Sequence, residues 1–153
     1  MKRLLLIVLP LFLIVGCSKE PINIDKLTDV DGIYYDRDTG ERYSGQVFGF
    51  DMGKDEGTLK NGRKDGLWIM YNQNGKKKYE RTYKDGKLDG KWTHWRDNGQ
   101  KSNEVTYKNG KEDGLVTWWY KNGQKWSETT YKDGEKISEE CWDEDGNVKE
   151  CWR

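Results

Sequence analysis

The sequence predicts an all-β fold: a meander of antiparallel β-hairpins in one elongated, twisted sheet, with a period of 24 residues. Three observations predict it. One phrase recurs, as YKDGKLDG at 83–90 and YKNGKEDG at 107–114. Asn-Gly or Asp-Gly dipeptides, which favour hairpin turns, recur every 11 to 13 residues. The segments between them are rich in Trp, Tyr, Thr and Val and leave no room for helices.

The N-terminus carries signals for export and lipidation. Lys2 and Arg3 precede an apolar run at 4–15 that is too short to span a bilayer, which indicates a signal peptide. The run ends in IVGC, and a small residue directly before Cys17 resembles the lipobox of bacterial lipoproteins. The resemblance implies cleavage before Cys17, acyl chains on it and, from Ser18, an outer-membrane location where the cell has two membranes. The alternative is a plain secretory signal with an incidental cysteine.

Three segments follow from this assignment. Residues 1–16 form the lipoprotein signal peptide. Residues 17–32 form the lipidated N-terminus and a flexible tether, because SKEPINIDKLTDVDG has no periodicity. Residues 33–153 form the hairpin repeat domain. We therefore expect a protein of the bacterial cell envelope, held at a membrane by its lipid.

Two glycine columns mark the turns of the repeat domain. We expect both to be two-residue type I′ turns, as at Asn98-Gly99 and Asn109-Gly110, so that one period is one hairpin. Strands lie ~4.8 Å apart, and each hairpin advances the sheet by ~10 Å. The first column holds Gly62, Gly86, Gly110 and Gly134, and the second holds Gly75, Gly99 and Gly123.

The turns also predict a strand register. A two-residue loop at Asp85-Gly86 places Tyr79 opposite Trp92. The same register places Asn103 opposite Val116. Cross-strand aromatic pairs contribute ~0.2–1 kcal/mol each, so these columns are expected to hold the sheet together.

The two remaining cysteines predict a disulfide in the last hairpin. With Cys17 lipidated, Cys141 and Cys151 are left, and an even count in an oxidising compartment favours pairing. A three-residue loop at 145–147 would place them directly opposite each other, ~4.5 Å apart at Cα, at the short end of disulfide geometry. The alternative is two free thiols, which a cytoplasmic location would favour.

Composition and motifs argue against catalysis and nucleic-acid binding. The chain has 27 basic and 27 acidic residues, without the basic excess of a nucleic-acid binder. Its 8 Trp and 9 Tyr compensate for scarce aliphatic residues in a thin core. The single histidine, His94, stands where other repeats have apolar or Thr residues, and no metal-ligand or nucleophile motif appears. We expect no enzyme, no metal and no cofactor.

The segment GKWTHWRDNGQKSNEVTYKNGK at 90–111 resembles the bacterial variant of the MORN (membrane occupation and recognition nexus) repeat. The resemblance extends over about 43–152 and implies an elongated β-sheet interaction scaffold. The eukaryotic unit is a residue shorter and richer in Gly-x-Tyr-x-Gly, so its lipid head-group association is not carried over. Relatives of the variant carry an antitoxin-like label.

These observations favour a membrane-anchored scaffold that binds a protein partner. Two alternatives remain open: an antitoxin or immunity protein that covers a toxin, and a module that stacks envelope glycan on aromatic rings. Trp95 and Trp119 have the opposite parity to Trp92 and, with Tyr71, form a second aromatic row. That row is the candidate binding face, and the alternative is that it fills the core.

Overall fold

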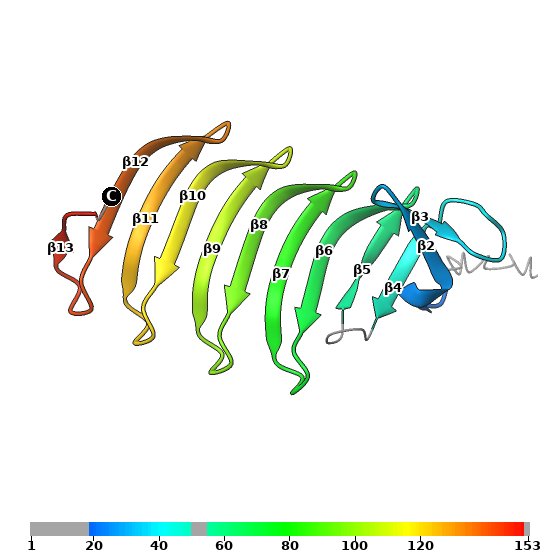
Figure 1. The fold of residues 1–153 in the computed structure, drawn as a ribbon, viewed down its shortest axis with the longest axis horizontal. Helices are drawn as coiled ribbons and strands as arrows, with labels where there is room; N and C mark the ends of the chain where they lie inside the picture. Colours follow the sequence, from blue (N-terminus) through cyan, green and yellow to red (C-terminus); the bar gives the residue numbers. More distant parts are fainter. Residues whose placement is uncertain (1–18, 50–54, 152–153) are drawn as a thin grey trace, which may run out of the picture.

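The computed structural model describes residues 19–49 and 55–151, and these form one long antiparallel meander (Figure 1). An 11-stranded sheet has the order β1-β4-β5-β6-β7-β8-β9-β10-β11-β12-β13, and β2 and β3 form a separate hairpin. The all-β prediction is confirmed. The strands are β1 (Ile22–Asn23), β2 (Leu27–Val30), β3 (Ile33–Asp36), β4 (Gly45–Gly49), β5 (Asp55–Lys60), β6 (Arg63–Tyr71), β7 (Lys77–Lys84), β8 (Lys87–Trp95), β9 (Lys101–Lys108), β10 (Lys111–Trp119), β11 (Lys125–Lys132), β12 (Glu135–Trp142) and β13 (Val148–Lys149), and the 3₁₀ helix η1 spans Ile24–Lys26.

The first turn column is type I′, as predicted. Asn61, Asp85, Asn109 and Asp133 have φ values of 49° to 51°, and the glycine after each also has positive φ.

The prediction of type I′ turns in the second column is wrong. At 97–99 only Gly99 has positive φ; its amide donates to the Arg96 carbonyl over 2.8 Å, which closes a three-residue loop. The Asn98 side chain accepts from the Gln100 amide over 3.0 Å, and this bond favours the looser loop over a two-residue turn.

The predicted register is also wrong, because the strand after each type I′ turn (β6, β8, β10 and β12) carries a bulge. Arg81, not Tyr79, lies opposite Trp92, since the pairing of β7 with β8 shifts at Asp89-Gly90. Asn103 likewise faces Trp118 across the strand pair. A bulge bends its strand, and Figure 1 shows β6, β8, β10 and β12 bending near their first residues. Gly90 has φ of 119°, and a Cβ there would lie 3.0 Å from the Thr82 side chain, so the position suits glycine alone.

The type I′ turn of each hairpin forms hydrogen bonds with the bulge of the preceding hairpin. The glycine amide of a type I′ turn donates to a strand carbonyl of the preceding hairpin, as Gly110 does to Leu88 over 2.7 Å. Beside it, the aspartate before the bulge glycine accepts the other turn amide: Asn109 donates to Asp89 Oδ2 over 3.1 Å. The backbone contact recurs from Gly62 to Tyr43, from Gly86 to Lys64 and from Gly134 to Glu112. The contact between a turn amide and a side chain recurs from Asn61 to Ser44, from Asp85 to Asp65 and from Asp133 to Asp113.

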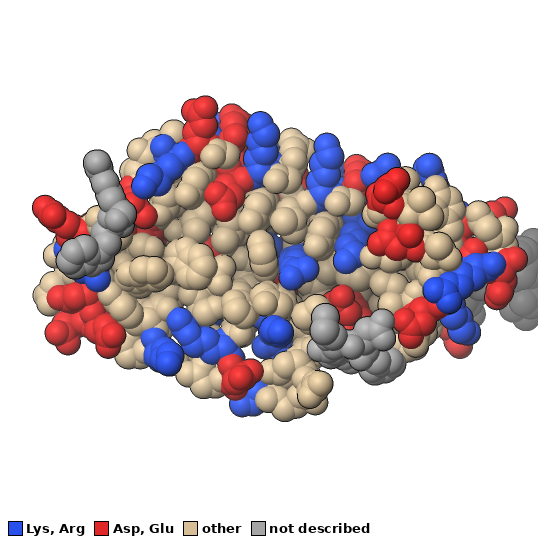
Figure 2. Space-filling model, in the orientation of Figure 1, with Lys and Arg blue, Asp and Glu red and all other residues tan. Residues whose placement is uncertain are grey.

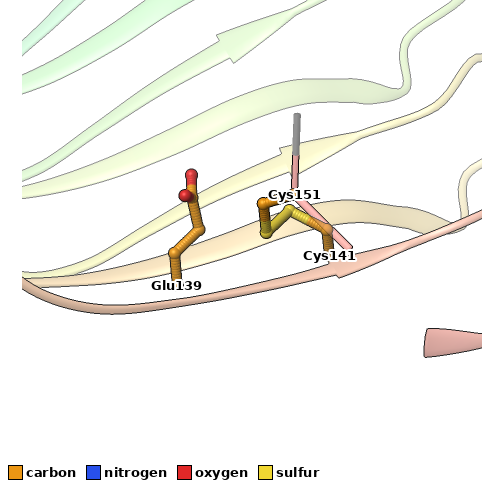
Figure 3. Close-up of side chains that lie close together, drawn as sticks. All are labelled: Glu139, Cys141 and Cys151. Atoms are coloured by element: carbon orange, nitrogen blue, oxygen red, sulfur yellow. A yellow bond between two sulfur atoms is a disulfide. The ribbon is translucent and has the colours of Figure 1, made fainter. Parts of the chain in front are cut away.

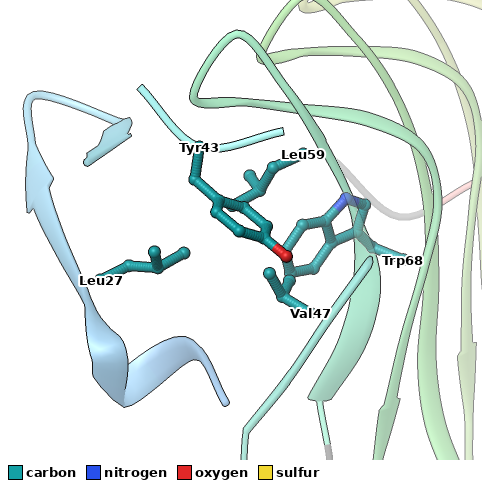
Figure 4. Close-up of a cluster of buried hydrophobic side chains, with 5 residues drawn as sticks. All are labelled: Leu27, Tyr43, Val47, Leu59 and Trp68. Carbon is teal, nitrogen blue, oxygen red and sulfur yellow. The ribbon is translucent and has the colours of Figure 1, made fainter. Parts of the chain in front are cut away.

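The buried apolar cluster lies at the N-terminal end of the sheet (Figure 4). Gly57 leaves room there for the Trp68 ring, since a Cβ on Gly57 would lie 2.2 Å from a ring atom. The Trp68 indole donates to the Thr58 carbonyl over 3.1 Å. The members of the cluster are Leu27, Tyr43, Val47, Leu59 and Trp68.

The N-terminal segment is a correction to the predicted domain boundaries, because residues 22–30 are not a flexible tether. β1 pairs in parallel with β4, and β2 joins β3 through a turn at Asp31-Gly32, where both φ values are positive. Leu27 is only 4% exposed, because it covers the open end of the sheet. Any tether therefore ends before Ile22.

The export and lipidation signals, including Cys17 and Ser18, lie outside the described residues. Within 19–49 and 55–151, no helix has the length and apolarity that crossing a bilayer demands.

Replacing Asp89 by alanine removes the acceptor for the Asn109 amide and leaves the bulge glycine in place. We expect the free energy of unfolding to fall by about 1 kcal/mol, because one net hydrogen bond contributes ~0.5–1.5 kcal/mol. Urea unfolding followed by Trp fluorescence measures it. The control is Glu135→Ala, an exposed acid of β12, which should change stability by less than about 0.5 kcal/mol. Equal losses in the two variants would contradict a linking role for the aspartate.

Candidate functional site

The strand pairings divide the side chains between two faces. Trp68, Arg81 and Trp92 lie opposite one another on β6, β7 and β8, and the same row continues through Val105 and Val116. We call this side the aromatic face. Glu80, Glu104 and Glu128 alternate with those positions and lie on the other side, the glutamate face.

The candidate row of Tyr71, Trp95 and Trp119 lies on the glutamate face, because Trp95 alternates with His94 along β8. A lysine of the preceding strand lies over each Trp: Lys77 Nζ is 5.4 Å from the Trp95 ring centre and Lys101 Nζ is 5.7 Å from that of Trp119. The Tyr71 hydroxyl donates to Glu56 over 2.9 Å.

Lys77 and Lys101, and Lys125 at the equivalent position of the next hairpin, also pair with the glutamate column. Lys101 reaches Glu104 over 2.6 Å, Lys125 reaches Glu128 over 2.6 Å, and Lys77 contacts Glu80. A partner that stacked on Trp119 would have to displace Lys101 from both the ring and the carboxylate. The binding role of this row stays a prediction, and its visible role is cross-strand packing.

The aromatic face is open over the middle and C-terminal part of the sheet. Figure 2 shows mainly uncharged residues across its middle, interrupted by charged side chains toward the N-terminal half, and charged residues along the two long edges, where the turns lie. Trp118 is 40% exposed and Trp126 is 43% exposed, with ring centres 6.2 Å apart in an edge-on arrangement. They border an open recess of about 580 Å³, which Val116, Thr129 and Tyr131 also line. Exposed aromatic pairs beside a recess are typical of binding surfaces.

The polar centre of the aromatic face holds His94. Its ring stacks on Tyr79 with 4.5 Å between centres, and its Nδ1 lies 2.9 Å from Ser102 Oγ. Burial holds the pKa of His94 below its ordinary value of 6.5. At the equivalent positions stand Met70 and Trp118, so the repeat does not require an imidazole here.

The Ser102–His94 contact is the nearest approach to a catalytic pair in the described part of the chain. A serine nucleophile needs an exposed hydroxyl, an orienting acid on the imidazole and amide donors for the oxyanion. Ser102 is buried at 9% exposure, its hydroxyl also donates to the His94 carbonyl over 3.3 Å, and no carboxylate of the described residues forms a hydrogen bond with the ring. The two side chains pack against each other between neighbouring strands and lack the surroundings of a catalytic pair.

At the C-terminal end a disulfide joins Cys141 and Cys151, with 5.4 Å between Cα atoms (Figure 3). The predicted register is wrong by two residues: Cys141 lies opposite Lys149, because the three-residue loop is 144–146. Glu139 lies beside the two sulfur atoms. Sulfurs in a disulfide offer no thiolate, so this group is not a metal site.

These features define a class: a single-layer repeat β-sheet that exposes one aromatic and one charged face. Within the sheet, residues 64–85, 88–109 and 112–133 match the family model described as MORN repeat variant. Each match covers one even-numbered strand, the three-residue loop and the next strand, so three consecutive hairpins match this repeat model. Sheets built from such repeats are typically non-catalytic. No curated protein and no solved structure matches the chain.

His94 should titrate with a pKa below 6.5, because its charged form is poorly solvated. The unfolded chain then binds the proton more tightly, so the stability that His94 contributes is complete above pH 6.5 and declines below it until the folded-state pKa is passed. An NMR titration of this single imidazole in untagged protein measures the pKa.

The control for stability is His94→Met, the residue found at position 70. Its free energy of unfolding should decline less than that of the wild type as the pH falls from 7 to 5. A pKa at or above 6.5, or identical pH profiles, would contradict the assignment of burial as the dominant effect.

Proposed function

We propose that this chain is a membrane-anchored, non-catalytic protein-interaction scaffold of the bacterial cell envelope, and that its aromatic face receives the partner. The observation that carries the proposal is the exposed Trp118–Trp126 pair beside an open recess. Over β7 to β12 no described helix or second sheet covers this face, and only the disulfide-linked segment at Cys151 lies on it, at β12. Single exposed apolar side chains are common, but a contiguous exposed apolar patch rimmed by polar residues marks an interaction site.

The dimensions of the surface support a macromolecular partner. Six strands from β7 to β12 span ~24 Å at ~4.8 Å per strand. Because the sheet is one layer thick there, its curvature is set by the bulges and turns and not by a covering helix. The surface is therefore formed before a partner arrives, which lowers the entropic cost of binding.

The order of segments at the N-terminus supports the anchor. A cleavable apolar run followed by Cys17 would leave a lipid five residues before Ile22, the first residue of β1. Five extended residues reach ~17 Å. In our proposal the β1 end of the sheet is thus close to the membrane, and the open recess near β11 lies at the far end, exposed to the periplasm or the cell exterior.

The test compares two double variants in the full-length lipidated protein within its own cells. We expect Trp118→Ala with Trp126→Ala, on the aromatic face, to lower the yield of the main cross-linked protein at least about tenfold, as for loss of aromatic anchors. Trp95→Ala with Trp119→Ala, on the glutamate face, removes two indoles as well and should leave the yield within about twofold.

Mass spectrometry of the captured species decides the outcome. Loss only in the glutamate-face variant would contradict the choice of face. Capture unchanged in both variants, or capture of peptidoglycan alone, would contradict the protein-interaction scaffold. Far-UV circular dichroism of each purified variant checks that the sheet is intact.

A further inference from the structure

Arg81 breaks the repeat on the aromatic face. At the equivalent positions of the other hairpins stand Gly57, Val105 and Thr129, which are small or apolar. Arg81 lies directly between Trp68 and Trp92 in the cross-strand row. A long charged side chain here is not required by the fold, because neighbouring repeats form the same strand with Val or Thr.

The Arg81 guanidinium contacts aromatic rings and forms no ion pair with a carboxylate of the described residues. Its central carbon lies 4.9 Å from the Tyr79 ring centre and 5.1 Å from that of Trp92. Its Nε is buried without a hydrogen-bond partner, as is the Trp92 indole nitrogen. Among the described residues no carboxylate lies within ion-pair distance of it, although such pairs form elsewhere on the sheet. An arginine stacked on aromatic rings keeps its terminal N–H groups in one orientation at low entropic cost.

Two cations and two acids lie around this position, and neither acid forms an ion pair with Arg81. Lys64 lies on the same face, 4.3 Å from the Trp68 ring centre, where the charges of Asp55 and Asp29 both act on it. Of these two acids, Asp55 is the one that also feels the charge of Arg81. His94 and Tyr107 complete the ionisable groups that Arg81 influences, and both are neutral near pH 7. A guanidinium without a direct acid partner, in a half-buried aromatic setting, attracts an anion more strongly than an exposed lysine does.

We propose that Arg81 is the carboxylate receptor of the aromatic face, where it pairs with a Glu or Asp side chain of a bound polypeptide. The inference rests on the proposed function, because it assumes that a polypeptide lies on this face. The guanidinium fork matches the two oxygens of a carboxylate. A phosphate dianion would need a second cation free of an acid, and Lys64 has Asp55 beside it.

The structure also sets the spacing of the motif that would be recognised. Val116 is the β10 residue in the same cross-strand row as Arg81, three strands and ~14 Å away, and Trp118 is two residues, or ~7 Å, further along β10. Arg81 and Trp118 are therefore ~16 Å apart along the sheet, a distance that their long side chains shorten. In an extended peptide, residues i and i+4 point to the same side and lie ~13 Å apart. The partner motif is therefore an acidic residue followed, or preceded, at four residues by a bulky apolar one that enters the recess at Trp118 and Trp126.

The test uses the mature chain and two matched probes, acetyl-Glu-Thr-Thr-Thr-Leu-amide and its Gln counterpart. NMR titration follows the Arg81 Nε–H and the indole N–H signals. We expect the wild type to bind the Glu probe about tenfold more tightly than the Gln probe, as for a charge-assisted hydrogen bond. Arg81→Val, which copies position 105, and Arg81→Gln should each reduce that ratio to near one. Arg63→Gln removes one exposed charge and should preserve it.

Three outcomes would overturn the proposal: equal binding of the two probes by the wild type, a preference that survives in Arg81→Val, or tighter binding of a phosphoserine probe than of the Glu probe. These failures are distinguishable from failure of the proposed function. If both probes shift the Trp118 and Trp126 signals equally, the face binds peptide and only the carboxylate receptor is refuted. If neither probe shifts the Trp118 and Trp126 signals, the aromatic face does not receive an extended peptide, and the proposed binding face is refuted together with the carboxylate receptor.

Discussion

The amide of each type I′ turn glycine donates to a carbonyl of the preceding hairpin, and the rest of the sheet depends on this contact. Beyond β6 the described chain has no second layer, so no extended apolar core orders the hairpins. The bulge at Asp89-Gly90 leaves a carbonyl and a carboxylate free at one edge, and the turn at Asn109-Gly110 satisfies both. Stability is then the sum of hairpins and their nearest-neighbour contacts, as in other repeat proteins.

Because the sheet is one layer thick, its two faces are stabilised in different ways. On the glutamate face, lysines such as Lys101 lie over one ring and reach one carboxylate, which binds neighbouring strands together without a core. The aromatic face is filled only at its N-terminal end, by the β2–β3 hairpin. Arg81 and the Trp118–Trp126 pair remain accessible to a partner. Both binding elements that we propose are therefore consequences of a sheet that stays one layer thick.

Much of the fold could be predicted from sequence, because glycine with Asn or Asp encodes turns locally. The bulge could not, since Asp89-Gly90 resembles a turn and its partner, the next turn amide, is twenty residues away in the chain. The β2–β3 hairpin was missed although Asp31-Gly32 signalled it, because this hairpin lies outside the period. Arg81 was detectable as a break in the column of Gly57, Val105 and Thr129, but only the structure shows that it lacks an acid partner.

Native-state amide hydrogen exchange at the turn glycines tests the central claim most directly. If the inter-hairpin contacts hold the sheet together, the amides of Gly86, Gly110 and Gly134 exchange as slowly as the central ladder amides and share their opening free energy. The amides of Gly75, Gly99 and Gly123, bonded only within their own loops, exchange faster. Fast exchange at the first set, with the ladder still protected, would show that the hairpins are ordered without these contacts.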